Sequence, residues 1–154
     1  MTLQQWEANG WLKPHKTSRK EIDNLLAIAR RDMTDARAKG ISDDWRFGIA
    51  YNAALKLCTV LLCAEGFRPP QSLTHYRTLQ ALPLILGTGR QADADYLEAC
   101  RRKRNTVEYD YVGGATGADA DELIAFAESL EKEVLTWLHA KHPKLAPPKG
   151  PAKP

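Results

Sequence analysis

The sequence predicts an all-α fold, an antiparallel up-and-down bundle of four main helices with one additional short helix. Apolar residues recur at steps of three and four along most of the chain, which is the period of a helix that buries one face. No segment shows the alternating pattern of a half-buried strand. The connecting segments are short, which favours antiparallel neighbours. At 154 residues the chain is long enough for one domain with a core of its own.

The first predicted helix spans residues 19–39. Ser18 followed by Glu21 is the pattern of a capping box, in which the side chain of each residue satisfies a backbone N–H of the other. Gly40 is the residue type that commonly follows the end of a helix. Between these signals the apolar positions form one helical stripe: Ile22, Leu25, Leu26, Ala29, Met33 and Ala36.

The second predicted helix begins after Ser42 and ends at Gly66. Its residues are apolar nearly all round, which is typical of a helix at the centre of a bundle or at a subunit interface. A third, shorter helix begins at Thr74, which can cap it. Pro83 is expected to make the second half of this helix irregular, because proline lacks a backbone N–H.

The fourth predicted helix spans about residues 93–108, and a fifth begins where Asp119 or Asp121 caps it. Glycine-rich segments at 87–90 and 113–117 flank the fourth helix. Neither segment follows a strand or matches a phosphate-binding loop, so both are expected to be turns.

Three segments are expected along the chain. Residues 1–17 form a lead-in, in which Trp6 and Trp11 are expected to dock on the body of the protein. Residues 18–142 form the helical bundle. Residues 143–154 are rich in proline and lysine and low in complexity, which predicts a disordered tail.

The net charge of +3 comes from the C-terminal tail. Without the three lysines of residues 143–154, basic and acidic residues are equal in number, at 19 each. A nucleic-acid-binding protein that relies on a broad basic surface usually shows an excess of basic residues. Any such contact is therefore expected to be local, or to be built by bringing two chains together.

The composition favours a cytoplasmic protein with reduced thiols. No apolar run approaches the roughly 20 residues that span a bilayer, and the N-terminus lacks the pattern of a secretory signal. Three cysteines, an odd number with no CxxC pair, suggest free and buried thiols. We therefore expect neither a membrane segment nor a disulfide framework.

The sequence predicts no metal site and no cofactor. His139 and His142 lie three residues apart at a helix end, but no third ligand lies nearby in the sequence. Cys58 and Cys63 lie five residues apart, on different faces of a helix, and are expected to be core residues. For His75, at the start of the third helix, a capping or packing role is favoured over a functional one.

The segment RRKRNTVEYD, residues 101–110, is the candidate functional motif. Arginine suits forked recognition of phosphate, while amides and phenols both donate and accept hydrogen bonds. An i,i+4 ion pair between Arg104 and Glu108 on an exposed helix face is the simpler explanation, and both interpretations stay open. The candidate ligand-binding residues are Arg101, Arg104, Asn105, Tyr109 and Tyr111.

The segment RNTVEYDY resembles the signature of the HEPN family (higher eukaryotes and prokaryotes nucleotide-binding domain). In that signature an arginine and a polar residue are separated by four to six residues from a histidine, which is often followed by x-Tyr. Arg104 matches the arginine and Asn105 the polar residue. Tyr109 stands where the shortest-spaced histidine would be, and Tyr111 matches the tyrosine. The layout of residues 18–140 is also similar to that of the family.

The resemblance implies a homodimer in which the two motif helices form one composite cleft. Active family members are metal-independent endoribonucleases, in which the arginine contacts the scissile phosphate and the histidine assists attack by the ribose 2′-OH. Many are toxins paired with a small nucleotidyltransferase antitoxin, and others bind RNA or nucleotides without catalysis.

Tyr109 in place of the histidine of the signature affects the expected activity. General acid–base catalysis works best with a pKa near the operating pH, which histidine meets at about 6.5 and tyrosine, at about 10, does not. The expected function is therefore RNA or nucleotide binding by a weakened or inactive ribonuclease site, with Arg104 and Tyr109 as its degenerate catalytic residues, in a toxin–antitoxin or defence setting. The alternatives are an active endoribonuclease toxin, and a non-catalytic interaction module paired with a nucleotidyltransferase.

Overall fold

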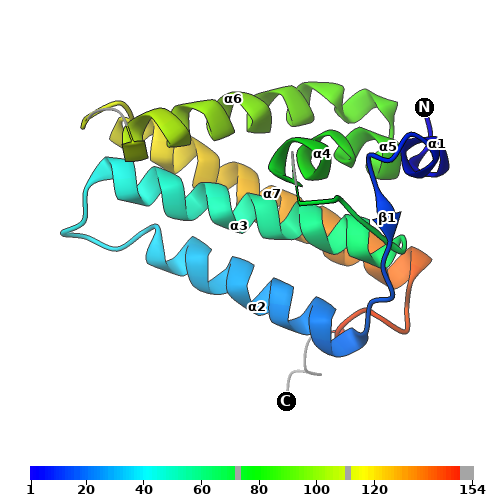
Figure 1. The fold of residues 1–154 in the computed structure, drawn as a ribbon. Helices are drawn as coiled ribbons and strands as arrows, with labels where there is room; N and C mark the ends of the chain where they lie inside the picture. The colour runs from blue at the N-terminus through cyan, green and yellow to red at the C-terminus, as the bar shows by residue number, and fades with distance from the viewer. Residues whose placement is uncertain (72–73, 110–111, 150–154) are drawn as a thin grey trace, which may run out of the picture.

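The computed structural model confirms the all-helical bundle (Figure 1) and describes residues 1–71, 74–109 and 112–149. Each long helix runs in the opposite direction to the long helix before it, as predicted for an up-and-down bundle. The long helices are α2 (Arg19–Asp35), α3 (Asp43–Ala64), α6 (Gln91–Tyr109) and α7 (Gly117–Lys141).

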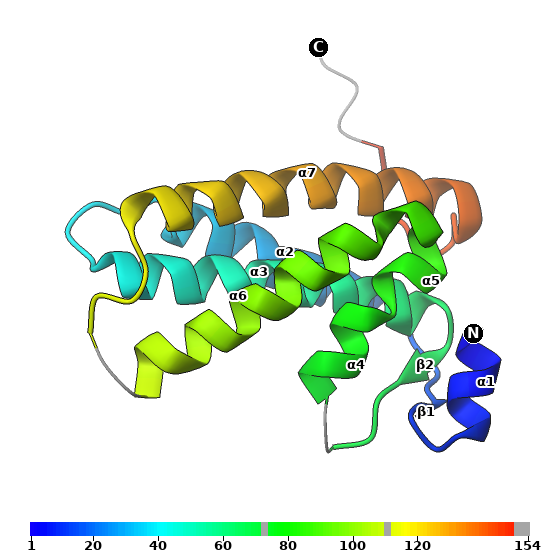
Figure 2. The ribbon, with the colours of Figure 1, turned by 90° about the horizontal axis from the view of Figure 1, so that it is seen from above.

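Helix α3 lies at the centre of the bundle (Figures 1 and 2), with α2, α6 and α7 around it. Almost every residue from Phe47 to Ala64 is buried. By length and composition α3 could also cross a membrane, but 78% of its most apolar window is buried inside the protein. The apolar character on all sides of α3 is thus accounted for by packing within one chain.

Helix α2 begins at the predicted residue, because the Ser18 side chain accepts a hydrogen bond of 3.1 Å from the backbone N–H of Glu21. The predicted capping box is only half formed, since the Glu21 carboxylate bonds Thr17 and His15 instead of the Ser18 N–H. The helix ends four residues earlier than expected, at Asp35. There the chain tightens into turns, in which Arg37 and Ala38 each donate to the carbonyl three residues back. Gly40, with a φ of +88°, lies in the loop that follows.

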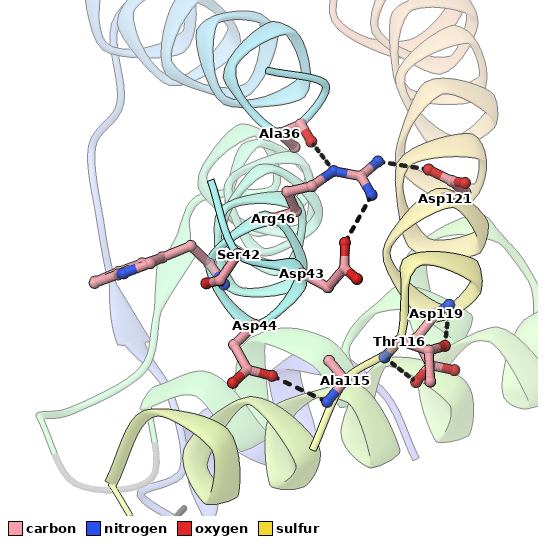
Figure 3. Close-up of polar contacts among 10 residues, drawn as sticks. Ala36, Ser42, Asp43, Asp44, Arg46, Ala115, Thr116, Asp119 and Asp121 are labelled. Carbon is pink, nitrogen blue, oxygen red and sulfur yellow. Dashed lines mark hydrogen bonds and ion pairs between the residues drawn. The ribbon is translucent and has the colours of Figure 1, made fainter. Parts of the chain in front are cut away.

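Arg46 joins three helices where α2, α3 and α7 meet (Figure 3). Its Nε donates to the carbonyl oxygen of Ala36 at 2.8 Å, just beyond the end of α2. Its two terminal nitrogens reach Asp43 at 3.2 Å and Asp121, in the first turns of α7, at 2.5 Å. The carbonyl of Ala36, left without a partner in α2 by the early end of that helix, is therefore satisfied by a side chain of α3.

Helix α7 begins earlier than predicted. Thr116, and neither Asp119 nor Asp121, is the N-cap. The Thr116 hydroxyl accepts from the backbone N–H of Asp119 at 3.0 Å, and the Asp119 carboxylate accepts from that of Thr116 at 2.9 Å (Figure 3). Both aspartates are thus occupied in other ways, Asp119 in a capping box and Asp121 in the ion pair with Arg46.

The predicted short helix is divided in two. Thr74 lies inside the first turn and donates to the carbonyl oxygens of Pro70 and Gln71 at 3.0 and 2.8 Å. A new helix begins at Leu82 after the break at Ala81, with Pro83 in its first turn, where its missing N–H is not needed. The pieces are α4 (Thr74–Gln80), α5 (Leu82–Leu86) and the 3₁₀ turn η1 (Thr88–Arg90).

The predicted lead-in contains structure of its own. It holds α1 (Leu3–Ala8), capped by Thr2, and a two-residue strand, β1 (Lys13–Pro14), that pairs antiparallel with β2 (Phe67–Arg68). Two residues are too few to show the period of a strand in a sequence. Trp6 is buried in a small satellite core with Leu12, Leu62, Phe67 and other apolar residues, so the segment docks on the bundle as expected.

The packed part of the chain continues past residue 142, where the sequence suggested that the tail begins. Leu145 and Ala146 pack on the main core, and Ala146 is buried. Residues 150–154, the remainder of the predicted tail, lie outside the residues that the structure describes.

We expect Arg46→Ala to lower the free energy of unfolding by about 1.5–3 kcal/mol, because the variant leaves a carbonyl and two carboxylates without their charged donor. Chemical denaturation of the two proteins measures the difference. Arg19→Ala is the control, since Arg19 is half-exposed and lies 3.9 Å from Asp23. It should change stability by less than about 0.5 kcal/mol. Equal effects of the two variants would show that Arg46 does not fasten the helices.

Candidate functional site

An open groove of about 770 Å³ lies between α4 and α6. It collects basic and polar side chains from two segments that are far apart in the sequence. The segment around α4 contributes Gln71, Thr74, His75 and Tyr76, and α6 contributes Glu98, Arg101, Arg102, Arg104 and Asn105. The groove thus contains three of the predicted ligand-binding residues, together with His75, for which a packing role was favoured.

The arginines reach the groove because of how α6 packs. Leu97 and Val107 are buried on the core side of α6 and fix its rotation. Arg101 and Arg104 follow Leu97 at helical spacing and are only partly exposed. The guanidinium carbon of Arg104 lies 5.7 Å from the ring centroid of Tyr51, a buried residue of α3. Arg104 is therefore held where α6 crosses α3.

Glu98 orients the arginines of the groove. Its carboxylate accepts two hydrogen bonds from Arg101, at 2.8 and 2.7 Å, and one from Arg102 at 3.2 Å. The bonds from Arg101 are the largest influence on the Glu98 carboxyl and keep its pKa below the usual value, although the residue is only 8% exposed. The sequence analysis did not single out Glu98, but its i,i+3 and i,i+4 spacing to the two arginines would have identified it.

His75 contacts the buried phenol of Tyr51. The Nδ1 of His75 lies 3.3 Å from Tyr51 Oη. Burial raises the pKa of Tyr51, so the phenol keeps its proton. Burial, followed by the positive charges of Arg104 and Arg101, lowers the pKa of His75. The imidazole is therefore neutral at neutral pH. Its contact with Tyr51 allows two tautomers, and in the one with its proton on Nδ1 the Nε2 lone pair can accept a proton.

The charge of the groove is positive. Three guanidinium groups stand against the single carboxylate of Glu98, and the other side chains that line it are neutral. Arg101 has five N–H donors and uses two of them to bond Glu98. Among its contacts with the residues that the structure describes, the other three donors remain available for a ligand. This arrangement suits a phosphate group better than a neutral ligand.

The structure divides the basic segment RRKR. Arg101, Arg102 and Arg104 line the groove, whereas Lys103 points to α7 and its Nζ lies 2.9 Å from Asp119. Asn105 lies in the groove, and its Oδ1 accepts from Arg104 Nη1 at 3.3 Å.

The two tyrosines of the motif cannot be placed in the groove. Tyr109 is the last residue of α6, and its side chain lies outside the part of the chain that the structure describes. Tyr111 also falls outside that part, as does the side chain of Glu108, the predicted partner of Arg104.

The three cysteines are buried, and His142 contacts the end of α3. Cys58, Cys63 and Cys100 are buried as free thiols, as expected. Burial raises the pKa of Cys58 to about 12, which leaves its thiol protonated and unreactive. His142 Nε2 lies 2.8 Å from Glu65, so it joins the end of α7 to that of α3.

Comparison with known proteins gives no assignment. The chain matches no family model, no curated protein and no solved structure. The function must therefore be inferred from the groove and its residues.

We expect His75 to titrate below its ordinary pKa, and Arg104→Gln to raise that value because a nearby positive charge is removed. NMR titration of the imidazole resonances, assigned with His75→Gln, measures both. Arg30→Gln is the control, since Arg30 pairs with Glu131 instead. A His75 pKa at or above about 6.5 would contradict the predicted surroundings.

The same shift predicts a pH dependence of stability. With a lower pKa in the folded state, the unfolded chain binds more protons between the two pKa values. The contribution of His75 to stability is therefore complete above about pH 6.5 and is lost as the pH falls towards the folded-state pKa. Comparison with His75→Gln by thermal unfolding at several pH values isolates this contribution.

Proposed function

We propose that the groove between α4 and α6 binds RNA or a nucleotide through its phosphate. The observation that carries the proposal is the gathering of Arg101, Arg102 and Arg104 in one groove, where the buried carboxylate of Glu98 holds the first two. A guanidinium group that is already held by Glu98 loses little freedom when it binds a ligand, so more of the interaction energy appears as affinity.

The remaining side chains of the groove suit the rest of a nucleotide. Asn105 offers an amide that both donates and accepts, and Tyr76 offers an aromatic face for a base. The volume of about 770 Å³ is in the range of small-ligand sites. These properties support a nucleotide, or one nucleotide of a single-stranded RNA, as the ligand.

The resemblance to the HEPN family supports the same ligand. Arg104 and Asn105, which match the signature, both line the groove. We extend the proposal to a homodimer, because two copies would double the arginines of a body whose net charge is close to zero. The setting proposed from the resemblance is a cytoplasmic toxin–antitoxin or defence system, with a nucleotidyltransferase as partner.

The leading form of the proposal is a ribonuclease-like site with weak or no activity. Tyr109 stands where the resemblance places the histidine that assists attack by the 2′-OH. A phenol with an ordinary pKa of about 10 is a poor general base at neutral pH. The loss of that assistance costs about 10²–10⁴-fold in rate.

A second candidate function, a metal-independent endoribonuclease, is favoured by the place of His75. Its neutral imidazole lines the groove together with the arginines. In this reaction Nε2 takes the proton of the ribose 2′-OH and the 2′ oxygen attacks phosphorus. The bond to the 5′ oxygen breaks, and that oxygen takes a proton from water, which leaves a 2′,3′-cyclic phosphate and a 5′-OH. The imidazolium gives its proton to the hydroxide so formed, which restores the neutral imidazole.

We expect the double variant Arg101→Ala/Arg104→Ala to weaken binding of a fluorescent single-stranded RNA or of ATP at least about tenfold, because direct phosphate contacts are lost. The slope of log affinity against log salt should fall by about 1 for each lost contact. Fluorescence anisotropy at several salt concentrations measures both quantities.

The matched control is Arg30→Ala/Arg37→Ala, which removes the same charge from α2 and its surroundings, where the arginines pair with Glu131 and Glu128. It should leave affinity within about twofold. An equal loss in both double variants would indicate unspecific attraction to net charge and would remove the groove from the proposal. Light scattering on the same samples tests the homodimer, and a monomer would restrict the site to one chain.

We expect no cleavage of the RNA by the wild-type protein with EDTA present. If a 2′,3′-cyclic phosphate product forms, His75→Ala should lower the rate about 10²-fold or more while RNA affinity stays the same. Tyr109→Phe is the companion variant and distinguishes a phenol from an imidazole as the acting group. Turnover that depends on His75 would replace the inactive form of the proposal with the second candidate.

A further inference from the structure

Three potential metal ligands meet where the N-terminal segment joins the bundle. His15 follows β1, Glu21 lies in the first turn of α2, and Cys63 lies in the last turn of α3. One ligand atom from each residue lies within 4.8 Å of the other two. The closest pair is His15 Nε2 and Glu21 Oε1, at 2.7 Å. These positions have no regular spacing in the chain, so they form no metal-binding pattern in the sequence.

The donor set is one that zinc prefers. Zinc binds imidazole nitrogen, thiolate sulfur and carboxylate oxygen, at about 2.0–2.3 Å, and in a tetrahedral site neighbouring ligand atoms are then about 3.3–3.8 Å apart. His15 and Glu21, whose side chains are 21% and 39% exposed, can separate by the small amount required. Cys63 is buried and supplies a fixed third ligand.

The charges of the three groups balance a divalent cation. A bound Zn²⁺ would displace the thiol proton of Cys63 to solvent. One thiolate and the Glu21 carboxylate would then neutralise the ion, with the imidazole of His15 as the third ligand.

Two further contacts hold the ligands in position. Thr17 Oγ1 donates to Glu21 Oε1 at 2.6 Å, which fixes the carboxylate. The backbone N–H of His15 donates to the carbonyl oxygen of Gly66 at 2.8 Å, one turn beyond Cys63. Contacts of this kind around the ligands are typical of metal sites in proteins.

We propose that His15, Glu21 and Cys63 bind one zinc ion, with water as the fourth ligand, and that this ion fastens residues 1–17 to the bundle. Other attachments of that segment include the small core around Trp6, the two-residue strand pair and the contact of Arg77 with the ring of Trp11 at 3.9 Å. The zinc would join the N-terminal segment, α2 and α3 to one another by coordinate bonds. The site is separate from the proposed nucleotide groove, and its test does not depend on that function.

The test uses tag-free protein that has been treated with a chelator and then titrated with Co²⁺ and with Zn²⁺. We expect one equivalent of Co²⁺ to release one proton and to produce the near-ultraviolet absorption of a thiolate–cobalt bond, and Zn²⁺ to displace the Co²⁺ and abolish that absorption. Cys63→Ser should abolish that absorption, and His15→Gln should weaken Zn²⁺ affinity at least about tenfold. Circular dichroism shows whether each variant is folded.

The matched control is His142→Gln, because His142 and Glu65 form a similar pair at 2.8 Å. It should bind cobalt like the wild type. Absence of stoichiometric binding to the wild type would overturn the proposal, and the Thr17, His15 and Glu21 contacts would then serve only the start of α2. An equal loss in His142→Gln, or cobalt absorption that persists in Cys63→Ser, would overturn it as well.

Limited proteolysis tests the structural role. Zinc should slow cleavage between residues 9 and 17 in the wild type, and should have no such effect in His15→Gln. Equal cleavage of the wild type with and without zinc would overturn the fastening role even if the metal binds.

Discussion

The fold depends on one constraint, the need to cover α3 on every side. A helix that is apolar all round cannot face water, so each of the other long helices must pack against it. Even the N-terminal segment takes part, since Leu62 of α3 belongs to the small core around Trp6. The short turns between the helices, and the side chains that satisfy the helix ends there, follow from this arrangement. Arg46 is the clearest example, because it connects α2 and α7 to the start of α3.

The candidate groove lies where the helices packed around α3 do not meet completely. The start of α4 and the polar face of α6 form a seam between them. Tyr51 reaches this seam from the core, and its ring and hydroxyl contact Arg104 and His75. A residue that stabilises the core therefore also positions the polar groups, so the chemistry of the groove is tied to the packing of α3.

Part of the candidate site was predictable from the sequence. Arg101, Arg104 and Asn105 were identified from their type and helical spacing, and they do share one groove. Lys103 belongs to the same basic segment. Successive residues are rotated by about 100° around a helix, so the side chain of Lys103 points to Asp119 on α7 and not into the groove. His75 gave no local signal, because its relation to the arginines arises only when α4 packs beside α6. The same is true of Glu21, His15 and Cys63.

The sequence by itself determined the helical class, the number of long helices and the starts of α2 and α3. These are local properties, because the apolar period and the capping side chains act within a few residues. Only the tertiary structure decided that α2 ends at Asp35, that α3 is central within one chain, and which polar groups meet. Those outcomes depend on contacts between distant segments, such as that of Arg46 with Ala36 and of His75 with Tyr51. Such contacts are set by the packing of whole helices, which no short stretch of sequence contains.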